Sequence, residues 1–550
     1  MDNLSGKKLS FWLQLLLFLG LFLALLRKIN DPDIWFHMVI GRETLKQWAI
    51  PQTEFYIFPV LGNPAEFHEF GFGVLYQLVY NLGGFTGMAI ANALLATLTL
   101  FLLYRAATGF VPKFNGPAVL VLGLAAFCLD FRLVYRPETV LFLCLALEIF
   151  CLERFAATSR VKWLWPIPLA AWVLSQMHPS ALIMLGVLGM YFCQFVAQNQ
   201  PLKLKRQQLG QIFAAVSVAL VVLASINPFG FKQVYLPLQT IFSSMELQGN
   251  VNEYMPVLRT EFKYHFIAIA LLGALAIWLL PQRRIVHTLL YLVFGWLAYR
   301  YVRNLGLFAI VMYVPIACLA QHLSQRYLNK MGPRLTPLAL PAALAIILVL
   351  PISQGRWGRG PIEGGFPEIS VKVIQYYLAD GNILNFYHLG GYLAWALGNN
   401  FKLAVDGHFI GSNPATEFHN SVIRTDPGWQ AKLDSYQVNT IVVPAIVPVH
   451  GLPLPILTAL AQDDSWALVT AEPAAMIFMR RSVLPYNTRE YDKSTIWKKM
   501  IYEAQQNVVV YPGFPGTYKA LGMAYRALGD WENAAINEQK YLRLTGKNNR

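Results

Sequence analysis

The chain has 550 residues, of which 56% are hydrophobic and only 13% are charged, and its mean hydropathy is +0.43. Soluble domains carry about 25% charged residues, so this composition excludes a soluble protein, a disordered chain, a collagen and a disulfide scaffold, and it predicts a membrane protein with several spans. The net charge of +14 does not indicate nucleic-acid binding, because the basic residues lie in short loops between apolar runs, as the positive-inside rule describes.

The first predicted element is a membrane helix at the N-terminus. Lys7 and Lys8 precede an apolar stretch over residues 11–26, which resembles a signal peptide. The stretch lacks a small-x-small cleavage site, however, and Arg27 and Lys28 follow it. We therefore expect an uncleaved first span.

Eleven apolar runs have about the 17–25 residues that a membrane span needs. They cover residues 11–26, 86–105, 117–134, 137–153, 163–178, 179–197, 210–226, 264–280, 285–301, 304–320 and 336–352. The Gly-rich segment 70–84 is shorter, and it fits an interfacial helix, a half-inserted helix or an extra span. Counting it as a span would mix the basic and acidic loops, so we favour eleven spans with a cytoplasmic N-terminus and an extracytoplasmic C-terminal part.

The composition changes after the last span, where the Gly-rich linker 354–361 ends the membrane part. We expect a membrane domain over residues 1–352 with a first outer loop at 27–85, an extracytoplasmic α/β domain over 353–485, and a helical segment over 486–550. Short β-like runs alternate with helix-like stretches in the α/β domain. These runs cover residues 383–386, 402–405, 440–443, 467–470 and 476–479.

The C-terminal helical segment resembles a tetratricopeptide repeat (TPR), which is a pair of packed helices. The residues at the repeat's spacing are Tyr518, Leu521, Gly522, Tyr525, Gly529 and Ala534. Glu538 and Tyr541 depart from the pattern, since an aromatic and a small residue are usual there. A stable solenoid needs at least three repeats, so we expect one repeat and part of another, or else a plain helical hairpin.

The first outer loop carries the residues that most suggest chemistry, beginning with Asp31 and Asp33. Carboxylates beside aromatic residues at a membrane surface are costly unless they are paired or functional. Two neighbouring acids suit a general base, a metal ligand or both. The structural alternative is that one of them caps the N-terminus of the following helix.

This loop resembles that of the GT-C superfamily of membrane glycosyltransferases, whose bacterial members show an Asp-x-x-Trp-(x)-His pattern, then a Gly, then Pro-x-x-Asp/Glu-aromatic. The matching residues are Asp31 or Asp33, Trp35, His37, Gly41, Pro51, Glu54 and Phe55. Glu54 stands where Asp is commoner. A second stretch found in such proteins is residues 390–395, Gly-Gly-Tyr-Leu-Ala-Trp, followed by Asp406-Gly407-His408, where relatives often have Arg in place of His408.

The resemblance covers residues 1–352 and, more weakly, the α/β domain. It implies a multi-pass enzyme of the bacterial inner membrane that moves a sugar from a polyprenyl-phosphate carrier to a glycan, lipid or protein acceptor at the outer face, with inversion. A loop aspartate would deprotonate the acceptor or bind a divalent metal, Mg or Mn. We favour Asp33 over Asp31 because it lies nearer to Trp35 and His37, and the metal ligands would be Asp33, Glu69 and His37.

Other polar residues at outer span ends should join the site. Arginine offers a bidentate fork for the donor phosphate. The candidates to contact substrate are Trp35, His37, His68, Glu69, Arg136, Glu138, His178, Asn227, Arg300, Arg303 and Asn304.

Each of these candidates also has a structural alternative. Arg136 and Glu138 are able to pair with each other at a span end. Arg300 and Arg303 are able to extend their charged groups to the lipid headgroups from the ends of their spans. His178-Pro179 is able to end a helix, and Asn227-Pro228 is able to form a turn. His68 is able to lie at the membrane interface with its hydrogen bonds made to water.

Two non-enzymatic functions compete with this interpretation. In the first, the spans only anchor a protein whose outer α/β and TPR-like parts recruit partners. In the second, the chain transports a lipid-linked substrate, which would place ionisable residues near mid-membrane. Only Asp130 and Glu148 are deep acids in the predicted spans, whereas most charges cluster at span ends. The clustering at outer ends favours an enzyme.

Overall fold

The computed structural model describes residues 2–109, 114–197, 204–237, 252–282, 284–327, 332–408 and 413–546. The chain divides into two compact units: a first unit of Met1–Asp31 and Phe67–Gly360, and a second unit of Pro32–Glu66 and Pro361–Arg550. The division after Gly360 lies close to the linker that the sequence predicts. Residues 32–66 of the predicted first outer loop, however, group with the second unit.

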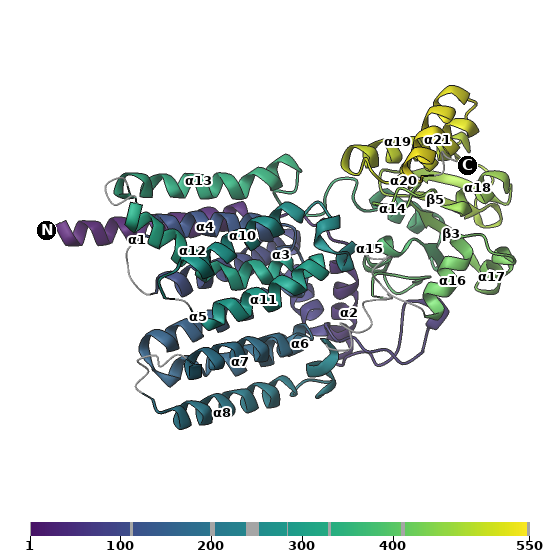
Figure 1. Ribbon diagram of the computed structural model, residues 1–550. Helices are drawn as coiled ribbons and strands as arrows, with labels where there is room; N and C mark the ends of the chain where they lie inside the picture. Colours follow the sequence, from purple (N-terminus) through teal and green to yellow (C-terminus); the bar gives the residue numbers. More distant parts are fainter. Residues whose placement is uncertain are drawn as a thin grey trace. The chain divides into compact units, whose positions relative to one another are not determined.

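The first unit is helical, and its helices run side by side (Figure 1). Each of the eleven predicted apolar runs overlaps one of them. They are α1 (Asp2–Ala24), α3 (Phe70–Thr108), α4 (Gly116–Leu129), α5 (Glu138–Thr158), α6 (Pro166–Met177), α7 (Ala181–Ala197), α8 (Arg206–Ala224), α10 (Lys263–Leu279), α11 (Ile285–Arg300), α12 (Leu305–Tyr327) and α13 (Gly332–Ser353).

Three helices of the described residues are long and apolar enough to cross a membrane: Phe70–Thr108, Arg206–Ala224 and Val302–Tyr327. Six further apolar helices are shorter. They are Lys8–Ala24, Gly116–Leu129, Ala181–Ala197, Lys263–Leu279, Ile285–Arg300 and Leu338–Ser353. The helical membrane class is thus supported, while the count of eleven spans stays a prediction.

Helix α3 contains a break that separates the predicted segment 70–84 from the span after it. Gly84 has φ 56° and ψ −150°, which are not helical angles. Glycine adopts a positive φ without the steric cost that a Cβ brings. The stretch before Gly84 is therefore a helical piece of its own, and its insertion into the membrane stays a prediction.

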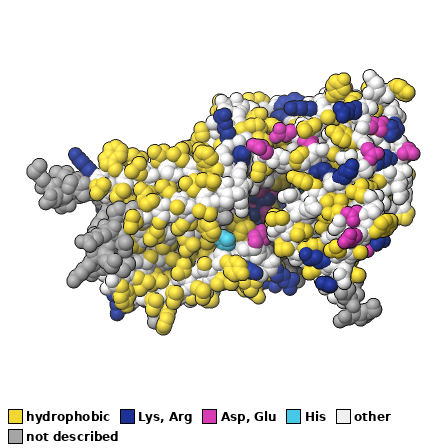
Figure 2. Space-filling view, turned by 90° about the horizontal axis from the view of Figure 1, so that it is seen from above, with side chains coloured by type: hydrophobic (Ala, Val, Ile, Leu, Met, Phe, Trp, Pro, Cys, Tyr) yellow, Lys and Arg dark blue, Asp and Glu magenta, His cyan; other side chains and the backbone are white. Residues whose placement is uncertain are grey.

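The outside of the first unit is hydrophobic. Figure 2 shows yellow side chains over much of the face of this unit, with few charges among them. Large apolar side chains are well exposed, for example Val218 on α8 at 63% and Trp278 on α10 at 67%. A soluble surface rarely carries contiguous apolar area on this scale, whereas a lipid-facing surface requires it.

The second unit contains a five-stranded sheet with the strand order β2-β1-β3-β5-β4. β1 pairs in parallel with β2 and β3, and the β3–β5 and β5–β4 pairs are antiparallel. The strands are β1 (Gly381–Asn385), β2 (Phe401–Leu403), β3 (Val438–Val443), β4 (Trp466–Ala471) and β5 (Met476–Arg480). All five coincide with the predicted β-like runs, so the expected small α/β domain is confirmed as a mixed sheet.

Helices surround this sheet, and the first-loop segment joins it. They are α2 (Asp33–Gln47), α14 (Glu368–Tyr377), α15 (Tyr387–Leu397), α16 (Pro414–Ile423), α17 (Trp429–Ser435) and α18 (Pro455–Gln462). The Leu403 amide donates to the Tyr56 carbonyl at 2.8 Å, and Ile57 bridges Leu403 in parallel, so the first-loop chain continues the sheet beyond β2.

Three helices follow the sheet: α19 (Ser494–Val510), α20 (Pro515–Ala527) and α21 (Trp531–Leu544). They are drawn in yellow-green to yellow in Figure 1. A Cβ added at Gly522 would lie 2.9 Å from the Glu538 Cγ, so the small residue on α20 lets α21 pack closely. The helices are present as expected, while their assignment as a TPR stays a prediction.

Candidate functional site

The two predicted catalytic aspartates lie on either side of the boundary between the two units. Asp31 belongs to the first unit, and Asp33 is the first residue of α2 in the second unit. Pro32, rather than either aspartate, is the N-cap residue of α2. The capping alternative therefore does not account for either aspartate. Asp33 still lies in the first turn, where the partial positive charge of the helix end stabilises a carboxylate.

Asp31 takes part in a chain of ion pairs in the first unit. Arg136 binds Asp31 through Nε and Glu253 through Nη1. Arg132 binds the same Glu253 oxygen at 3.0 Å through Nη1 and Glu138 through Nη2. Asp31 and Arg132 are buried, and the other three side chains are partly buried. This series of ion pairs brings the first loop together with the start of α5.

Arg303 is the last member of this series of ion pairs. Its Nη2 lies 3.4 Å from Glu138, and its Nη1 donates to the Tyr254 hydroxyl at 2.7 Å. The Asp31 cluster, as we call it, thus consists of Asp31, Arg132, Arg136, Glu138, Glu253, Tyr254 and Arg303. It contains three of the predicted candidates with Asp31 and adds Arg132, Glu253 and Tyr254. The sequence indicated these three added residues only by their position near the outer ends of predicted spans.

The charges in the Asp31 cluster balance, with three carboxylates and three guanidinium groups. Burial raises the pKa of Glu253, but Arg132 and Arg136 outweigh this effect and lower it below the ordinary value. Glu253 therefore stays ionised, and each arginine is held by carboxylates. Arg136 pairs with Asp31 and Glu253, so its neighbour in sequence, Glu138, is left to Arg132 and Arg303.

His178 and Glu69 form a second polar pair in the first unit. The His178 Nε2 lies 3.5 Å from Glu69 Oε1, and its Nδ1 lies 2.7 Å from the Ser180 hydroxyl. His178 is the C-cap residue of α6, as the helix-ending alternative predicts. It therefore ends the helix and also faces a predicted acid.

His68 lies in the same unit and contacts Gln233, which sequence reasoning missed. Its Nδ1 is 3.0 Å from Gln233 Oε1, and its ring lies 4.5 Å from that of Phe229. The Gln233 amide donates in turn to the His68 carbonyl at 3.0 Å. These bonds fix the His68 ring through protein groups.

Three other candidates have local contacts. The Asn227 amide donates to the Ala224 and Gly230 carbonyls at 2.7 and 3.1 Å, so Asn227 forms the turn that its alternative describes. Asn304 donates to the Leu297 carbonyl at 3.3 Å. Arg300 lies beside the Tyr301 ring at 5.8 Å. Their predicted contacts with substrate stay predictions.

Asp33 lies close to the second motif in the second unit. A Cβ added at Gly407 would stand 2.9 Å from Asp33 Oδ1, so the Asp33 carboxylate lies close to this glycine. Burial and the Asp33 carboxylate both raise the pKa of Tyr387, at the start of α15. The stretch Asp406-Gly407-His408 thus reaches the proposed base.

A buried network fastens this stretch to the first loop. The His408 Nδ1 lies 2.5 Å from Asp406 Oδ1, and its Nε2 lies 3.4 Å from Glu54 Oε2. The Tyr56 hydroxyl donates to Asp406, and Asp406 and Glu54 are 0% and 2% exposed. Burial lowers the pKa of His408, but the two carboxylates outweigh it and raise it to about 10. His408 is therefore held as a cation between two buried carboxylates.

The second unit is expected to lose stability as the pH rises from about 6.5 to about 10. The pKa of folded His408 lies above its ordinary value of 6.5. Its stabilising contribution is therefore complete below pH 6.5 and is lost as the pH passes through about 10. The measurement is the melting temperature of the full-length protein across this range, for wild type and His408→Gln. An equal pH dependence in both proteins would contradict the assignment.

Trp35 and His37 lie in the core of the second unit. Trp35 is 0% exposed, and its ring lies 5.0 Å from that of Tyr392 and 4.6 Å from that of Trp395. His37 is 2% exposed. The structure gives both residues a packing role on α2, and their predicted contact with substrate stays a prediction.

The Gly390-Gly391 pair lies inside helix α15. A Cβ added at Gly390 would lie 2.3 Å from the Val405 carbonyl oxygen. One added at Gly391 would lie 2.8 Å from the Phe36 amide nitrogen. The two glycines thus let α15 approach the strand end on one side and α2 on the other.

Gly391→Ala is expected to destabilise the second unit by about 1–3 kcal/mol, the usual cost of forcing an extra methyl group into a packed interior. The added group presses on backbone of α2, which is less able to yield than a side chain. The measurement is thermal unfolding of the full-length protein. Gly398→Ala is an unsuitable control because of its positive φ, whereas Gly513, with nothing within 4 Å of an added Cβ, is suitable. Equal melting temperatures for Gly391→Ala and Gly513→Ala would overturn the packing argument.

The predicted metal ligands are divided between the two units. Asp33 and His37 belong to the second unit, and Glu69 belongs to the first. Within the part of the chain that the structure describes, no group of three or more His, Cys, Asp or Glu side chains is arranged to hold a metal ion. The metal therefore stays a prediction.

Comparison with solved structures shows that a similar fold occurs in a known protein. The oligosaccharyltransferase of Archaeoglobus fulgidus, solved with a tethered acceptor peptide containing an NVT sequon, aligns with 87% of this chain and 75% of its own. The TM-score is 0.56 at 12% identity. The chain is similar in fold to the GT-C glycosyltransferases. The resemblance predicted from the first loop is therefore confirmed at the level of the fold.

A second solved structure superposes less well on this chain. Apo ArnT from Cupriavidus metallidurans aligns with 88% of this chain and 100% of its own at 14% identity, with a TM-score of 0.39, which is too low to define a common fold. No protein-family model matches the sequence, and no curated protein matches it.

Proposed function

We propose that the protein is a membrane glycosyltransferase of the GT-C type, which transfers a sugar from a polyprenyl-phosphate-linked donor to an acceptor at the extracytoplasmic face. The observation that carries the proposal is the Asp31 cluster, in which acids and arginines from the first loop and several span ends meet within a GT-C-like fold. A mere anchor has no need of such a costly set of charges at a bundle end. Its proposed place is the bacterial inner membrane.

The proposed reaction is a displacement at the anomeric carbon. The acceptor's nucleophilic atom forms a bond to this carbon from the face opposite the phosphate, and the bond from carbon to phosphate oxygen breaks. Asp33 accepts the acceptor's proton, and the departing polyprenyl phosphate takes the electron pair. The configuration inverts because attack and departure occur on opposite faces. We keep Asp33 as the base, because it lies nearer than Asp31 to Trp35 and His37 along the chain and its carboxylate lies close to Gly407 of the second motif.

The arginines of the Asp31 cluster are proposed to hold the leaving phosphate. Carboxylates hold the guanidinium groups of Arg132, Arg136 and Arg303 in place. A phosphate offers the same bidentate acceptors as a carboxylate, so it is able to exchange with Glu138 or Glu253 for the guanidinium N–H groups. If a divalent metal also binds, it would neutralise phosphate charge, with Asp33, Glu69 and His37 as proposed ligands.

One observation favours the alternative of a non-enzymatic assembly protein. The C-terminal helices expose large apolar side chains, among them Val509 at 80%, Trp531 at 66% and Ile536 at 55%. Such surfaces are able to bind partner proteins. In the enzyme, the same helices and the α/β domain are proposed to bring the acceptor or cover the site.

The test is transfer by the purified full-length protein in lipid nanodiscs. A panel of polyprenyl-phosphate sugars is combined with glycan, lipid and peptide acceptors. We expect transfer by wild type and by Arg326→Gln, a control near the end of α12, and strongly reduced transfer by Arg132→Gln. Absence of transfer across the panel, together with full cellular function of Arg132→Gln and of the two aspartate variants, would favour the assembly protein.

A further inference from the structure

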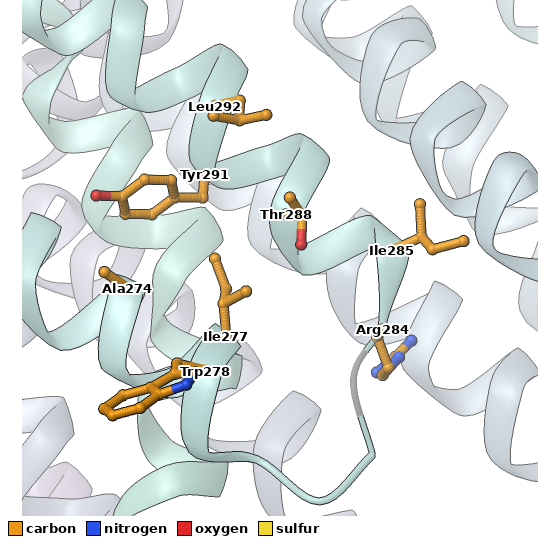
Figure 3. Close-up of a pocket in the computed structure, with 8 residues that line it drawn as sticks. All are labelled: Ala274, Ile277, Trp278, Arg284, Ile285, Thr288, Tyr291 and Leu292. Atoms are coloured by element: carbon orange, nitrogen blue, oxygen red, sulfur yellow. The ribbon is translucent and has the colours of Figure 1, made fainter.

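A groove lies between α10 and α11 of the first unit, beside the loop that joins them. Its volume is about 500 Å³. Figure 3 shows Ala274, Ile277 and Trp278 on α10 facing the space that residues of α11 border. The lining from the second helix and the loop is Arg284, Ile285, Thr288, Tyr291 and Leu292. The walls are therefore apolar, with one charged residue at the loop end.

The charged end of the groove is Arg284. Its Nη1 contacts both carboxylate oxygens of Glu153 at 2.8 Å, and Glu153 also accepts from the Tyr191 hydroxyl at 2.8 Å. The described ion pair uses only this one nitrogen of the guanidinium. Glu153 thus fixes the group at the groove end, where the remaining N–H donors are able to meet a phosphate.

The rest of the groove suits an acyl chain. Trp278 and Leu292 are 67% and 59% exposed, so the groove opens toward the lipid-facing surface. Arg284 and Leu292 are eight residues apart, which is about 12 Å along a helix. This length approaches the ~15 Å of hydrocarbon in one leaflet of a ~30 Å core. A lipid with its headgroup at Arg284 would lay its chain along Thr288 and Leu292.

The groove is distinct from the Asp31 cluster. Arg284 precedes α11, whereas Arg303 follows it, and α11 has 16 residues or about 24 Å of helix. The two charged sites therefore lie at opposite ends of the bundle. A donor phosphate held at the Asp31 cluster therefore does not meet Arg284.

We propose that this groove is a specific site for an anionic phospholipid, whose phosphate binds Arg284 and one of whose acyl chains occupies the space between α10 and α11. Basic pockets between membrane helices take up anionic headgroups because the charge and the apolar walls match the two parts of the lipid. The ion pair with Glu153 keeps the arginine rigid, and a preorganised donor costs less entropy on binding. The site does not depend on the proposed transfer reaction.

The test measures which lipids the full-length protein retains. The protein is reconstituted in nanodiscs with equal phosphatidylglycerol and phosphatidylcholine, released in the mass spectrometer, and analysed for bound lipid. We expect wild type to retain phosphatidylglycerol in preference, and Arg284→Gln to lower this preference about five-fold, which corresponds to the ~1 kcal/mol of one cation near an anionic surface. Arg326→Gln, an exposed cation on α12, should leave it unchanged.

A second pair of variants guards against misfolding of Arg284→Gln, which leaves Glu153 without its arginine. Thr288→Trp fills the groove from an exposed position and keeps the ion pair, while Val293→Trp adds the same bulk on α11 outside the groove. We expect only Thr288→Trp to lose bound phosphatidylglycerol. Equal retention of both lipids by wild type, or unchanged retention in Thr288→Trp, would overturn the proposal.

Discussion

Asp33→Asn is expected to lower sugar transfer by about 10²–10⁴-fold, the usual contribution of a general base, while the melting temperature stays that of wild type. The amide keeps the size of the carboxylate, so it preserves the approach to Gly407, but it does not accept the acceptor's proton. The measurement is the transfer rate at saturating donor and acceptor, with the pH profile of the residual activity.

Asp31→Asn is the matched variant, because it makes the same chemical change two residues away. It removes a negative charge from Arg136, so the loss should show first as lower stability of the first unit and weaker donor binding. If Asp31→Asn abolished transfer at wild-type stability while Asp33→Asn retained it, the roles of the two aspartates would be exchanged. If neither variant affected transfer, both would be excluded as the base.

Asp130→Asn is expected to lower the free energy of unfolding of the first unit by about 3–5 kcal/mol, the cost of breaking a buried ion pair from one side. Asp130 Oδ1 accepts from Arg27 at 2.7 Å, and its Oδ2 accepts from Arg356 at 2.5 Å. Asp130 and Arg27 are 5% and 3% exposed. Without the carboxylate, two arginines lie close together with no acid between them, and the ends of α1, α4 and the linker lose their common tie.

The measurement is denaturant unfolding of the protein in mixed micelles, followed by signals from each of the two units. Asp426→Asn provides a control, because its partner Arg424 is 63% exposed and surface pairs contribute only about 0–1 kcal/mol. A loss for Asp130→Asn no larger than that of the control would show that Asp130 does not hold these segments together.

The sequence by itself determined the elements of this protein. Apolar runs such as 285–301 predict helices because a lipid-facing backbone must satisfy its hydrogen bonds within one segment. The strand at 440–443 and its neighbours were identified because short β-branched runs between turn residues are typical of buried strands. The motif around Asp31 and Asp33 also indicated the GT-C-like fold, since the order of such residues along the chain is visible without coordinates.

Only the tertiary structure decided which charges meet. Arg136 and Asp31 lie 105 positions apart, and Tyr56 and Asp406 lie 350 positions apart. The sequence singled out Arg300 as a phosphate ligand and passed over Arg132, because span ends carry similar charges. In the described contacts, however, it is Arg132 rather than Arg300 that binds acids of the Asp31 cluster. The division of Asp31 from Asp33 between two units was likewise hidden. Partner choice depends on distances between segments, and these are set by packing rather than by spacing along the chain.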